Sequence, residues 1–256
     1  MNIVSSLNEN IMSLFREQRD HKLKSMTKML VDSGKVVKRL LRNSGNIDAV
    51  ICTKNFFETN QSLIEEANIG ELCILEDNET KDIVGHRIHQ GVMALADRPQ
   101  DVKLDELGNK ILILNGVNNA ENVGAICRSA LAFGVDSIVI DSNSCSPFVR
   151  RAIRVSMGSV FKMKFMHTDN LKDLLEDLYK DSYSIVSASN DEGAMKLKDV
   201  DFNKKTALVL GNEGDGVDEV IKNLSDYVVK IPINREVDSL NVAVASSILL
   251  YELGGL

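Results

Sequence analysis

Apolar positions in the second half of the chain form short continuous runs that alternate with segments of helical spacing. Residues 110–115 (KILILN) and 136–141 (DSIVID) flank a helix-spaced stretch at 122–133. Short apolar runs of this kind are typical of parallel strands covered on both faces. Further strands are predicted at 161–166, 184–188, 207–211 and 228–231, and further helices at 147–155, 171–180, 217–224 and 240–253. The alternation predicts an α/β fold with a parallel sheet between two helical layers.

The first half has a different pattern and predicts a smaller α/β unit. Residues 10–44 lack proline and carry apolar positions at helical spacing, broken only at Ser33 and Gly34, which predicts two consecutive helices or one interrupted helix. Strands are predicted at 49–52, 72–75 and 91–96, and helices at 56–67 and 81–86. Residues 97–108 are polar and contain a proline, as linkers often do. The pattern therefore predicts a domain at 1–97, a linker at 98–108 and a second domain at 109–256.

Composition is that of a folded protein of the cell interior. The chain has 256 residues with 44% hydrophobic content, and its 26% charged residues form no long single-sign tract. Its first residues, MNIVSSLNENIM, include no basic residue, which argues against a signal or transit peptide. No apolar stretch approaches the roughly 20 residues that span a bilayer. We expect a cytoplasmic protein that does not enter membranes.

The cysteines and histidines do not indicate a metal site. The four cysteines are far apart and form no CxxC pair, and the four histidines show no HExxH spacing. We expect reduced, buried or half-buried thiols, and nothing in the sequence requires a metal. The cysteines are Cys52, Cys73, Cys127 and Cys145.

The net charge of −7 argues against a protein that binds nucleic acid, but the distribution of the charged residues along the chain does not. Residues 16–42 hold nine Lys or Arg against three acids, and residues 142–168 hold five against none. Local potential, rather than total charge, attracts a phosphate backbone. Alternatively, these basic residues lie on helix faces that are exposed to solvent and bind nothing, and the sequence leaves this explanation open.

Polar side chains gather in three loops that each follow a predicted strand, where ligands of parallel sheets bind. The first loop leads from Asn115 to Arg128 and is rich in asparagine, which caps helices well. Arg128 follows a glycine and precedes Ser129 and Ala130 on a largely apolar helix, which suggests a charge directed at a negative group.

The second loop, LVLGNEGDGV at 208–217, has three glycines that let backbone amides approach a ligand, with Glu213 among them. It lacks the glycine order of dinucleotide-binding folds and P-loops, so a tight turn without a ligand explains it equally well. In the third loop Ser239 is a candidate N-cap, while Asn241 in a first helical turn is locally unfavourable and suggests a function. The small residues that follow, at 243 and 245–247, predict close packing against a helix of this chain or of a second copy.

Together these loops resemble the SpoU/TrmH family of SPOUT RNA 2'-O-ribose methyltransferases. The matching patterns are N-x-G-A-x-x-R-S-A-x-x-F-G from Asn122, L-G-x-E-G-x-G from Leu210, and I-P-I followed by S-L-N-V-x-V-A from Ile231. They occur in the family's order over the last ~150 residues. The sequence HQGV from His89 is similar to the end of the family's small N-terminal substrate-binding domain.

The resemblance implies a C-terminal sheet with a deep trefoil knot, a homodimer, and S-adenosylmethionine bound at the knot. It implies catalytic roles for Asn122, Arg128, Glu213, Ser239 and Asn241. The implied cofactor contacts are Leu210, Gly211, Asn212, Gly216, Ile231, Pro232, Leu240 and Asn241. Backbone groups around glycine suit the uncharged edge of an adenine.

The reaction implied is attack of a ribose 2'-hydroxyl on the cofactor's methyl group. A guanidinium does not deprotonate in proteins, so Arg128 is expected to hold the target phosphate and to stabilise the developing alkoxide. RNA is the expected partner rather than DNA, which lacks the 2'-hydroxyl. The N-terminal domain favours ribosomal RNA over transfer RNA by analogy. Alternatives are an inactive RNA-binding assembly factor of the same fold and a nicotinamide-dependent oxidoreductase, although the latter's fingerprint is absent after Leu114.

Overall fold

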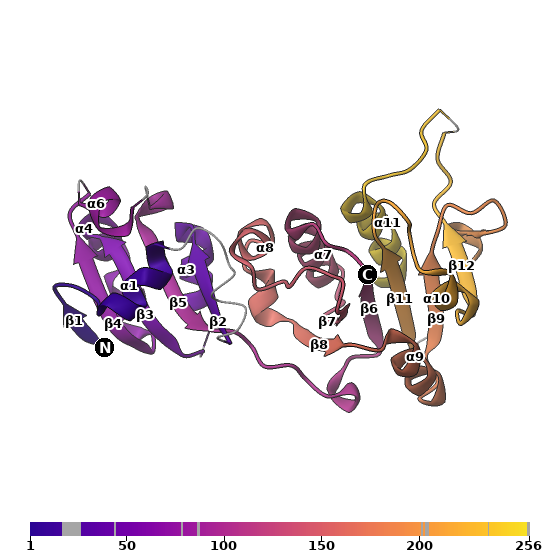
Figure 1. Cartoon of the computed structure of the whole chain (residues 1–256), viewed down its shortest axis with the longest axis horizontal. Helices are drawn as coiled ribbons and strands as arrows, with labels where there is room; N and C mark the ends of the chain where they lie inside the picture. Colours follow the sequence, from indigo (N-terminus) through magenta and orange to yellow (C-terminus); the bar gives the residue numbers. More distant parts are fainter. Residues whose placement is uncertain are drawn as a thin grey trace. The chain divides into compact units, whose positions relative to one another are not determined.

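The computed structural model describes residues 1–16, 27–43, 45–77, 79–85, 88–200, 202, 205–234 and 236–254. It divides into two compact units. The first comprises Met1–Pro99 and Phe148–Phe161, and the second comprises Gln100–Pro147 and Lys162–Leu256. Figure 1 shows the elements of both units in sequence colours.

The first unit is built on a mixed sheet, which over the described residues has five strands in the order β1-β4-β3-β5-β2. β1, β4 and β3 are parallel, and β5 runs antiparallel to both β3 and β2. The strands are β1 Asn2–Val4, β2 Lys28–Asp32, β3 Ile47–Thr53, β4 Ile69–Leu75 and β5 Val92–Asp97. The helices are α1 Glu9–Arg16, α3 Gly34–Leu41, α4 Lys54–Thr59, α5 Gln61–Glu66, α6 Thr80–Val84 and α8 Arg150–Val155, with a 3-10 turn η1 at His89–Gly91.

The expected helical segment at 10–44 is wrong at its centre, where β2 is a strand. Met29, Leu30 and Val31 are consecutive and all buried, a pattern that a helix with one solvent face cannot produce. They are buried because β2 pairs with β5 along five registered positions. Residues 17–26 of the predicted helices lie outside the described residues. Tertiary pairing here overrides local helical spacing.

α8 is tied to the first unit by a buried carboxylate. Asp32 at the end of β2 is 4% exposed, and it accepts Arg150 Nε at 2.9 Å and Arg154 Nη1 at 3.3 Å. Two of the five basic residues at 142–168 therefore neutralise a buried acid.

The second unit contains the predicted parallel sheet, whose seven described strands run in the order β10-β12-β9-β11-β6-β7-β8. All neighbouring pairs are parallel, which confirms the predicted α/β class. The strands are β6 Lys110–Asn115, β7 Ser137–Asp141, β8 Lys164–Thr168, β9 Ser184–Ala188, β10 Met195–Lys196, β11 Thr206–Gly211 and β12 Tyr227–Lys230. The helices are α7 Ala120–Ala132, α9 Leu171–Lys180, α10 Glu219–Asn223 and α11 Val242–Gly254, and 3-10 turns are η2 Leu104–Glu106 and η4 Leu197–Asp199. A further 3-10 turn, η3 Ser159–Lys162, belongs to the first unit except for its last residue.

β8 begins later than the predicted 161–166, because η3 occupies the residues before Met163. β10 is a short edge strand that the hydrophobic pattern did not predict. The other strands of this sheet lie within one residue of their predicted bounds at each end.

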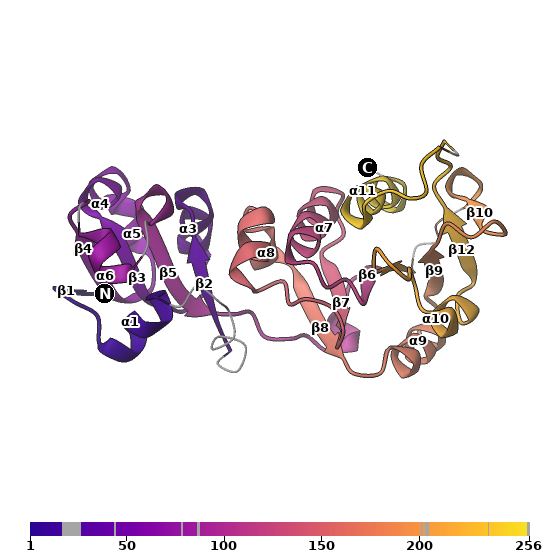
Figure 2. The same ribbon diagram turned by 45° about the horizontal axis from the view of Figure 1, so that its top comes forward.

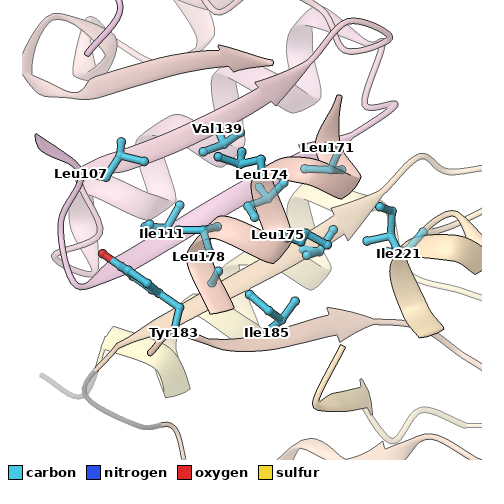
Figure 3. Close-up of a cluster of buried hydrophobic side chains, with 14 residues drawn as sticks. Leu107, Ile111, Val139, Leu171, Leu174, Leu175, Leu178, Tyr183, Ile185 and Ile221 are labelled. Atoms are coloured by element: carbon cyan, nitrogen blue, oxygen red, sulfur yellow. The ribbon is translucent and has the colours of Figure 1, made fainter. Parts of the chain in front are cut away.

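Helices cover both faces of the second sheet, with α7 and α11 on one face and α9 and α10 on the other (Figure 2). Beneath α9 the leucines at 171, 174, 175 and 178 meet Ile111, Val139 and Ile185 from the strands (Figure 3). These leucines recur every three or four residues, so one face of α9 is buried. Burying each large aliphatic side chain contributes about 1.5–3 kcal/mol. This core holds the strand ends that form the site.

α11 packs its small residues against α7 within the chain. Ser246 is fully buried, and the hydroxyls of Ser247 and Ser129 lie 2.8 Å apart in a hydrogen bond between the two helices. The small-residue stretch is therefore used inside this chain. No helix in the described part of the chain is both long and apolar enough to cross a bilayer.

Candidate functional site

A pocket of about 290 Å³ lies at the carboxyl ends of β9, β11 and β12. Its lining includes eight positions that the sequence motifs predicted, and we call it the strand-end pocket. These eight are Leu210, Gly211, Asn212, Glu213, Gly216, Ile231, Ser239 and Leu240. Apolar side chains from α11, Val242, Ala245 and Leu249, also line it. The pocket thus combines exposed backbone with an apolar wall.

The glycine-rich loop folds back on itself to form one side of this pocket. Asn212 Oδ1 accepts the amides of Gly214 and Asp215, each at 2.7 Å, and the Gly216 amide donates to the Asn212 carbonyl at 3.2 Å. A Cβ on Gly211 would overlap the backbone of Gly216 and Val217. Gly216 has a φ of 73°, the left-handed region that favours glycine. Position 211 therefore requires glycine because the backbone of Gly216 and Val217 packs directly against it. Position 216 favours glycine because its φ is positive.

A chain of polar contacts joins the three motifs. Asn122 Nδ2 donates to Glu213 Oε1, and Asn241 Nδ2 donates to Asn122 Oδ1 at 3.1 Å. Asn122 is 9% exposed, whereas Glu213 faces solvent and the pocket. Residues 122, 213 and 241 are far apart in sequence, so the fold brings the predicted catalytic carboxamides and carboxylate together.

The structure corrects our interpretation of how α11 begins. The cap is Asn241 rather than Ser239, because the helix begins at Val242 and Asn241 Oδ1 accepts the Ala243 amide at 2.9 Å. Asn241 therefore lies where asparagine is favoured and not inside a first turn, so its conformational cost was the wrong reason to suspect a function. Ser239 is exposed and lines the pocket.

Arg128 and Pro232 do not line the strand-end pocket. Arg128 is exposed on α7, six residues beyond Asn122, and its side chain makes no hydrogen bond or ion pair with any residue that the structure describes. Pro232 is exposed between Ile231 and Ile233, which both line the pocket. Arg128 is thus available to a group outside the pocket.

Sequence reasoning missed one wall of the pocket, the loop after β9. Ser189, Asn190 and Asp191 line it, and Asp191 accepts Lys222 Nζ at 2.8 Å. The hydrogen bond from Lys222 holds the pKa of Asp191 below its ordinary value. Lys230 Nζ also donates to the Asp191 and Glu192 carbonyls, at 3.2 and 2.6 Å. The polar run SNDEG directly after a predicted strand was the signal that could have revealed this wall.

A buried network anchors the first and second loops to the sheet. Asn115, the last residue of β6, donates through Nδ2 to Asp141 at 3.2 Å and to Asp218 at 2.9 Å, and its Oδ1 accepts the Asp218 amide at 2.8 Å. Asp141 also accepts the Gly116 amide at 3.1 Å. The loop carrying Glu213 and the loop leading to Asn122 are therefore fixed to the same strand ends. Asn119 caps α7, accepting the Glu121 amide at 2.8 Å.

The charged side chains that line the pocket are all acidic. Its described lining includes the carboxyl groups of Asp191, Glu213 and Asp215 and no Lys, Arg or His. Such a lining favours a ligand with positive charge.

Across the described residues, no group of three or more His, Cys, Asp or Glu is arranged to hold a metal ion. The thiols are buried or half-buried as predicted, and burial raises the pKa of Cys127 to about 12.

Comparison with known proteins shows relatives of one kind. The SpoU rRNA Methylase family pattern matches residues 109–251, more than half of the chain. An uncharacterised tRNA/rRNA methyltransferase of Mycobacterium tuberculosis is 31% identical over 176 residues, which are 66% of this chain and 61% of that protein's length. The 23S rRNA (guanosine-2'-O-)-methyltransferase RlmB of Coxiella burnetii is 32% identical over 206 residues, 75% of this chain and 81% of RlmB.

Solved structures share the whole fold. The SpoU methyltransferase AviRb of Streptomyces viridochromogenes, in complex with AdoMet, superposes with a TM-score of 0.80 at 19% identity, covering 97% of this chain and 98% of AviRb. An AdoMet-bound rRNA methyltransferase of Sinorhizobium meliloti gives a TM-score of 0.80 at 21% identity, covering 98% and 97%. The three motifs, the strand-end pocket and these matches agree, and the chain belongs to the SpoU rRNA Methylase family.

Proposed function

We propose that this protein transfers a methyl group from S-adenosylmethionine to a ribose 2'-hydroxyl of RNA. The observation that carries the proposal is the contact chain Glu213–Asn122–Asn241 beside the strand-end pocket. A tight turn without a ligand would explain the glycines, but it would not explain why three distant polar side chains meet there. A SpoU methyltransferase and an rRNA methyltransferase of the same fold have both been solved with AdoMet.

The residues of the pocket fit S-adenosylmethionine. Its apolar wall of Ile231, Leu240 and Leu249 suits an adenine ring, and the Gly211 backbone leaves room that a side chain would take. The carboxylates around the opening suit a molecule whose sulfonium and amino groups are positive. When bound, S-adenosylmethionine supplies an electrophilic methyl group.

The chain's own residues would position the nucleophile. The Asn122–Glu213 contact fixes both side chains, so they can hold a ribose hydroxyl in line for attack. Arg128 carries a permanent charge and five donors, so it can bind the target phosphate through two parallel hydrogen bonds. The same charge stabilises the alkoxide that develops as the 2'-hydroxyl loses its proton to phosphate or water.

Ribosomal RNA is the substrate class that we favour. The C. burnetii relative is a 23S rRNA methyltransferase, while the mycobacterial relative is described only as acting on tRNA or rRNA. The first unit supplies a module in addition to the catalytic one, which is consistent with a large structured substrate. We also propose that the catalytic domain spans 109–256, with its chain threaded as a trefoil knot, in a cytoplasmic enzyme.

A homodimer is part of the proposal. The exposed face of α11 carries Val244, Ile248 and Tyr251, whose exposed fractions are 51%, 38% and 62%. These residues are spaced as one helical stripe, which we call the α11 stripe. An exposed apolar stripe on a helix whose other face is packed is typical of a subunit interface.

Replacement of Arg128 by lysine tests the mechanism, because lysine keeps the charge and loses the planar fork. We expect kcat/KM for RNA to fall by about 100-fold or more, which is the usual cost of losing one electrostatic contact to the transition state. The affinity for S-adenosylmethionine should not change. Methyl incorporation into RNA from a strain lacking the protein would be the assay, with Arg98→Lys as the matched control. Wild-type turnover by Arg128→Lys would contradict phosphate anchoring.

Calorimetry separates the enzyme from the inactive assembly factor. We expect the wild-type protein to bind S-adenosylmethionine in the micromolar range. Absence of binding would favour the RNA-binding factor of the same fold.

A further inference from the structure

Asn115 lies outside the strand-end pocket, yet its side chain is bonded to the end of the loop that carries Glu213. It is the last residue of β6, between β11 and β7 in the sheet, and it is 4% exposed. Its Nδ2 donates to Asp141 at 3.2 Å and to Asp218 at 2.9 Å, and its Oδ1 accepts the Asp218 amide at 2.8 Å. Both donors and the acceptor of the carboxamide are therefore used.

The two carboxyl groups beside Asn115 have no cation to pair with. Asp141 is 6% exposed, and its donors in the described part of the chain are all neutral: Asn115, the Gly116 amide at 3.1 Å and the Ser144 hydroxyl at 2.6 Å. No Lys, Arg or His of the described residues forms an ion pair with Asp141 or Asp218. A buried carboxyl group without a cation depends on its hydrogen bonds, so the Asn115 donors cannot be lost without cost.

The glycine-rich loop is held at both ends by two neighbouring residues of the first loop. At the far end, the Asp218 amide donates to Asn115. At the near end, Gly116 packs against Asn212, because a Cβ on Gly116 would lie 3.3 Å from Asn212 Nδ2. Gly116 has a φ of 75°, so this position also favours glycine for its backbone conformation. Glu213 lies between the two held ends of the loop.

The chain that follows fixes the partner of Glu213. The Val117 amide donates to Ser144 Oγ at 2.9 Å, and the Val117 carbonyl accepts the Cys145 amide at 2.9 Å. The first loop is thus bound to the residues after β7 before α7 begins. Asn122, in the first turn of α7, then donates to Glu213 Oε1. The segment that begins at Asn115 therefore places both members of this contact.

We propose that Asn115 is a positioning residue for methyl transfer, whose carboxamide holds Glu213 against Asn122 from outside the pocket. Alanine at this position would offer no bond to either neighbouring carboxyl group, and an ionised aspartate would offer no donor. Asn115 itself contacts neither cofactor nor RNA. The expected effect on rate rests on the proposed function, whereas the positioning is a property of the protein without ligands.

The first test is the kinetics of Asn115→Ala, with Ser137→Ala as matched control, at a temperature at which both are folded. Ser137 is also fully buried and its hydroxyl accepts the Gly108 amide at 2.8 Å, but it begins β7, at the opposite edge of the sheet. We expect Asn115→Ala to lower kcat about 100-fold, the effect of a small misplacement of reacting groups, with the KM for RNA unchanged. Wild-type kcat in Asn115→Ala, or an equal loss in Ser137→Ala, would overturn the inference.

The second test observes the contact without any catalysis. The NMR resonances of the Asn122 side-chain NH2 group report its bond to Glu213 in the protein without cofactor. In Asn115→Ala they should move toward their positions in Glu213→Ala, where the bond is absent, and in Ser137→Ala they should stay. Shifted resonances in a protein that binds no S-adenosylmethionine would contradict the methyltransferase alone. Unshifted resonances in a protein that binds S-adenosylmethionine would contradict the positioning role alone.

Asn115→Asp adds a pH signature that a loss of packing would not produce. The new carboxyl group would face Asp141 and Asp218, the charged residues bonded to position 115. Like charges disfavour its ionised form, so its pKa should lie above the ordinary Asp value of about 3.9. While protonated it keeps one donor. The kcat of this variant relative to the wild type should therefore be highest at low pH and fall as pH rises through the raised pKa.

Asn115→Ala is the control for this pH profile, because it places no titrating group between the two carboxyl groups. Its kcat relative to the wild type should be low and independent of pH. A ratio for Asn115→Asp that is equally independent of pH would contradict the role of the Asn115 donors.

Discussion

At the scale of single residues, the most constrained position of the site is Gly211. No side chain fits there, since a Cβ would meet the backbone of Gly216 and Val217 across the folded loop. The atoms that would be met are backbone, so they cannot swing aside like the end of a flexible side chain. Glu213 and Asn212 depend on this closure because they lie between the two glycines.

Gly211→Ala is therefore expected to open the loop. We expect S-adenosylmethionine affinity to fall at least about tenfold and stability to fall by about 1–3 kcal/mol, the cost of forcing extra atoms into a packed place. Calorimetry and thermal unfolding measure the two effects. Gly193→Ala is the matched control, because a Cβ there meets nothing within 4 Å. Equal affinity of Gly211→Ala and Gly193→Ala for S-adenosylmethionine would show that the tight packing of the loop against Gly211 does not matter for binding.

The ion pair of Asp191 with Lys222 has a consequence for pH dependence. The bond from Lys222 lowers the pKa of Asp191, so the pair adds stability above the ordinary Asp pKa of about 3.9, and this is lost as pH falls through the lowered value. Lys222→Met should raise the pKa of Asp191 toward the ordinary value, and NMR titration of its carboxyl group measures this. Lys172→Met, which removes a pair with Glu176 on α9, should leave it unchanged. An unshifted Asp191 in Lys222→Met would refute the assignment.

At the scale of elements, α11 depends on Asn241 in two ways that can be separated. Its oxygen caps the helix at the Ala243 amide, and its nitrogen holds Asn122. Asn241→Ser can keep the cap but cannot reach Asn122, whereas Asn241→Ala loses both contacts.

We expect Asn241→Ala to lower stability by about 1 kcal/mol, the usual value of an N-cap, and Asn241→Ser to have little effect. Both should reduce methyl transfer, because both free Asn122. Denaturant unfolding and RNA methylation assays give the two readouts. Full activity in Asn241→Ser would show that the side chain serves only as a cap.

At the scale of the whole molecule, the α11 stripe predicts a dimer. Ile248→Glu/Tyr251→Glu should convert the wild-type dimer to a monomer, since charges buried at an apolar interface are costly. Sedimentation velocity at micromolar concentration measures this. Tyr179→Glu, on an exposed face of α9 at 65% exposure, should leave the dimer intact. A wild-type protein that is monomeric at this concentration would contradict the proposed homodimer.

The sequence by itself determined most of the strands and helices of the second unit. Its central strands β6, β7 and β11 are continuous apolar runs buried on both faces, so each run predicts one strand without knowledge of its neighbours. The motif loops follow those strands, and parallel strands place all their carboxyl ends at one edge. For that reason the meeting of Glu213, Ser239 and Leu240 in one pocket follows from the order of strands and loops along the chain.

Tertiary structure alone decided what depends on partners distant in the chain. β2 has helical spacing but is a strand because β5 pairs with it. Asp191 joins the pocket because β9 lies between β11 and β12, and strand order is not encoded in local pattern. A groove on the first unit gathers Lys35 and Lys38 from α3 and Lys81 from α6, which no regular spacing relates. Local periodicity fixes which residues are buried, whereas pairing and strand order fix which of them meet.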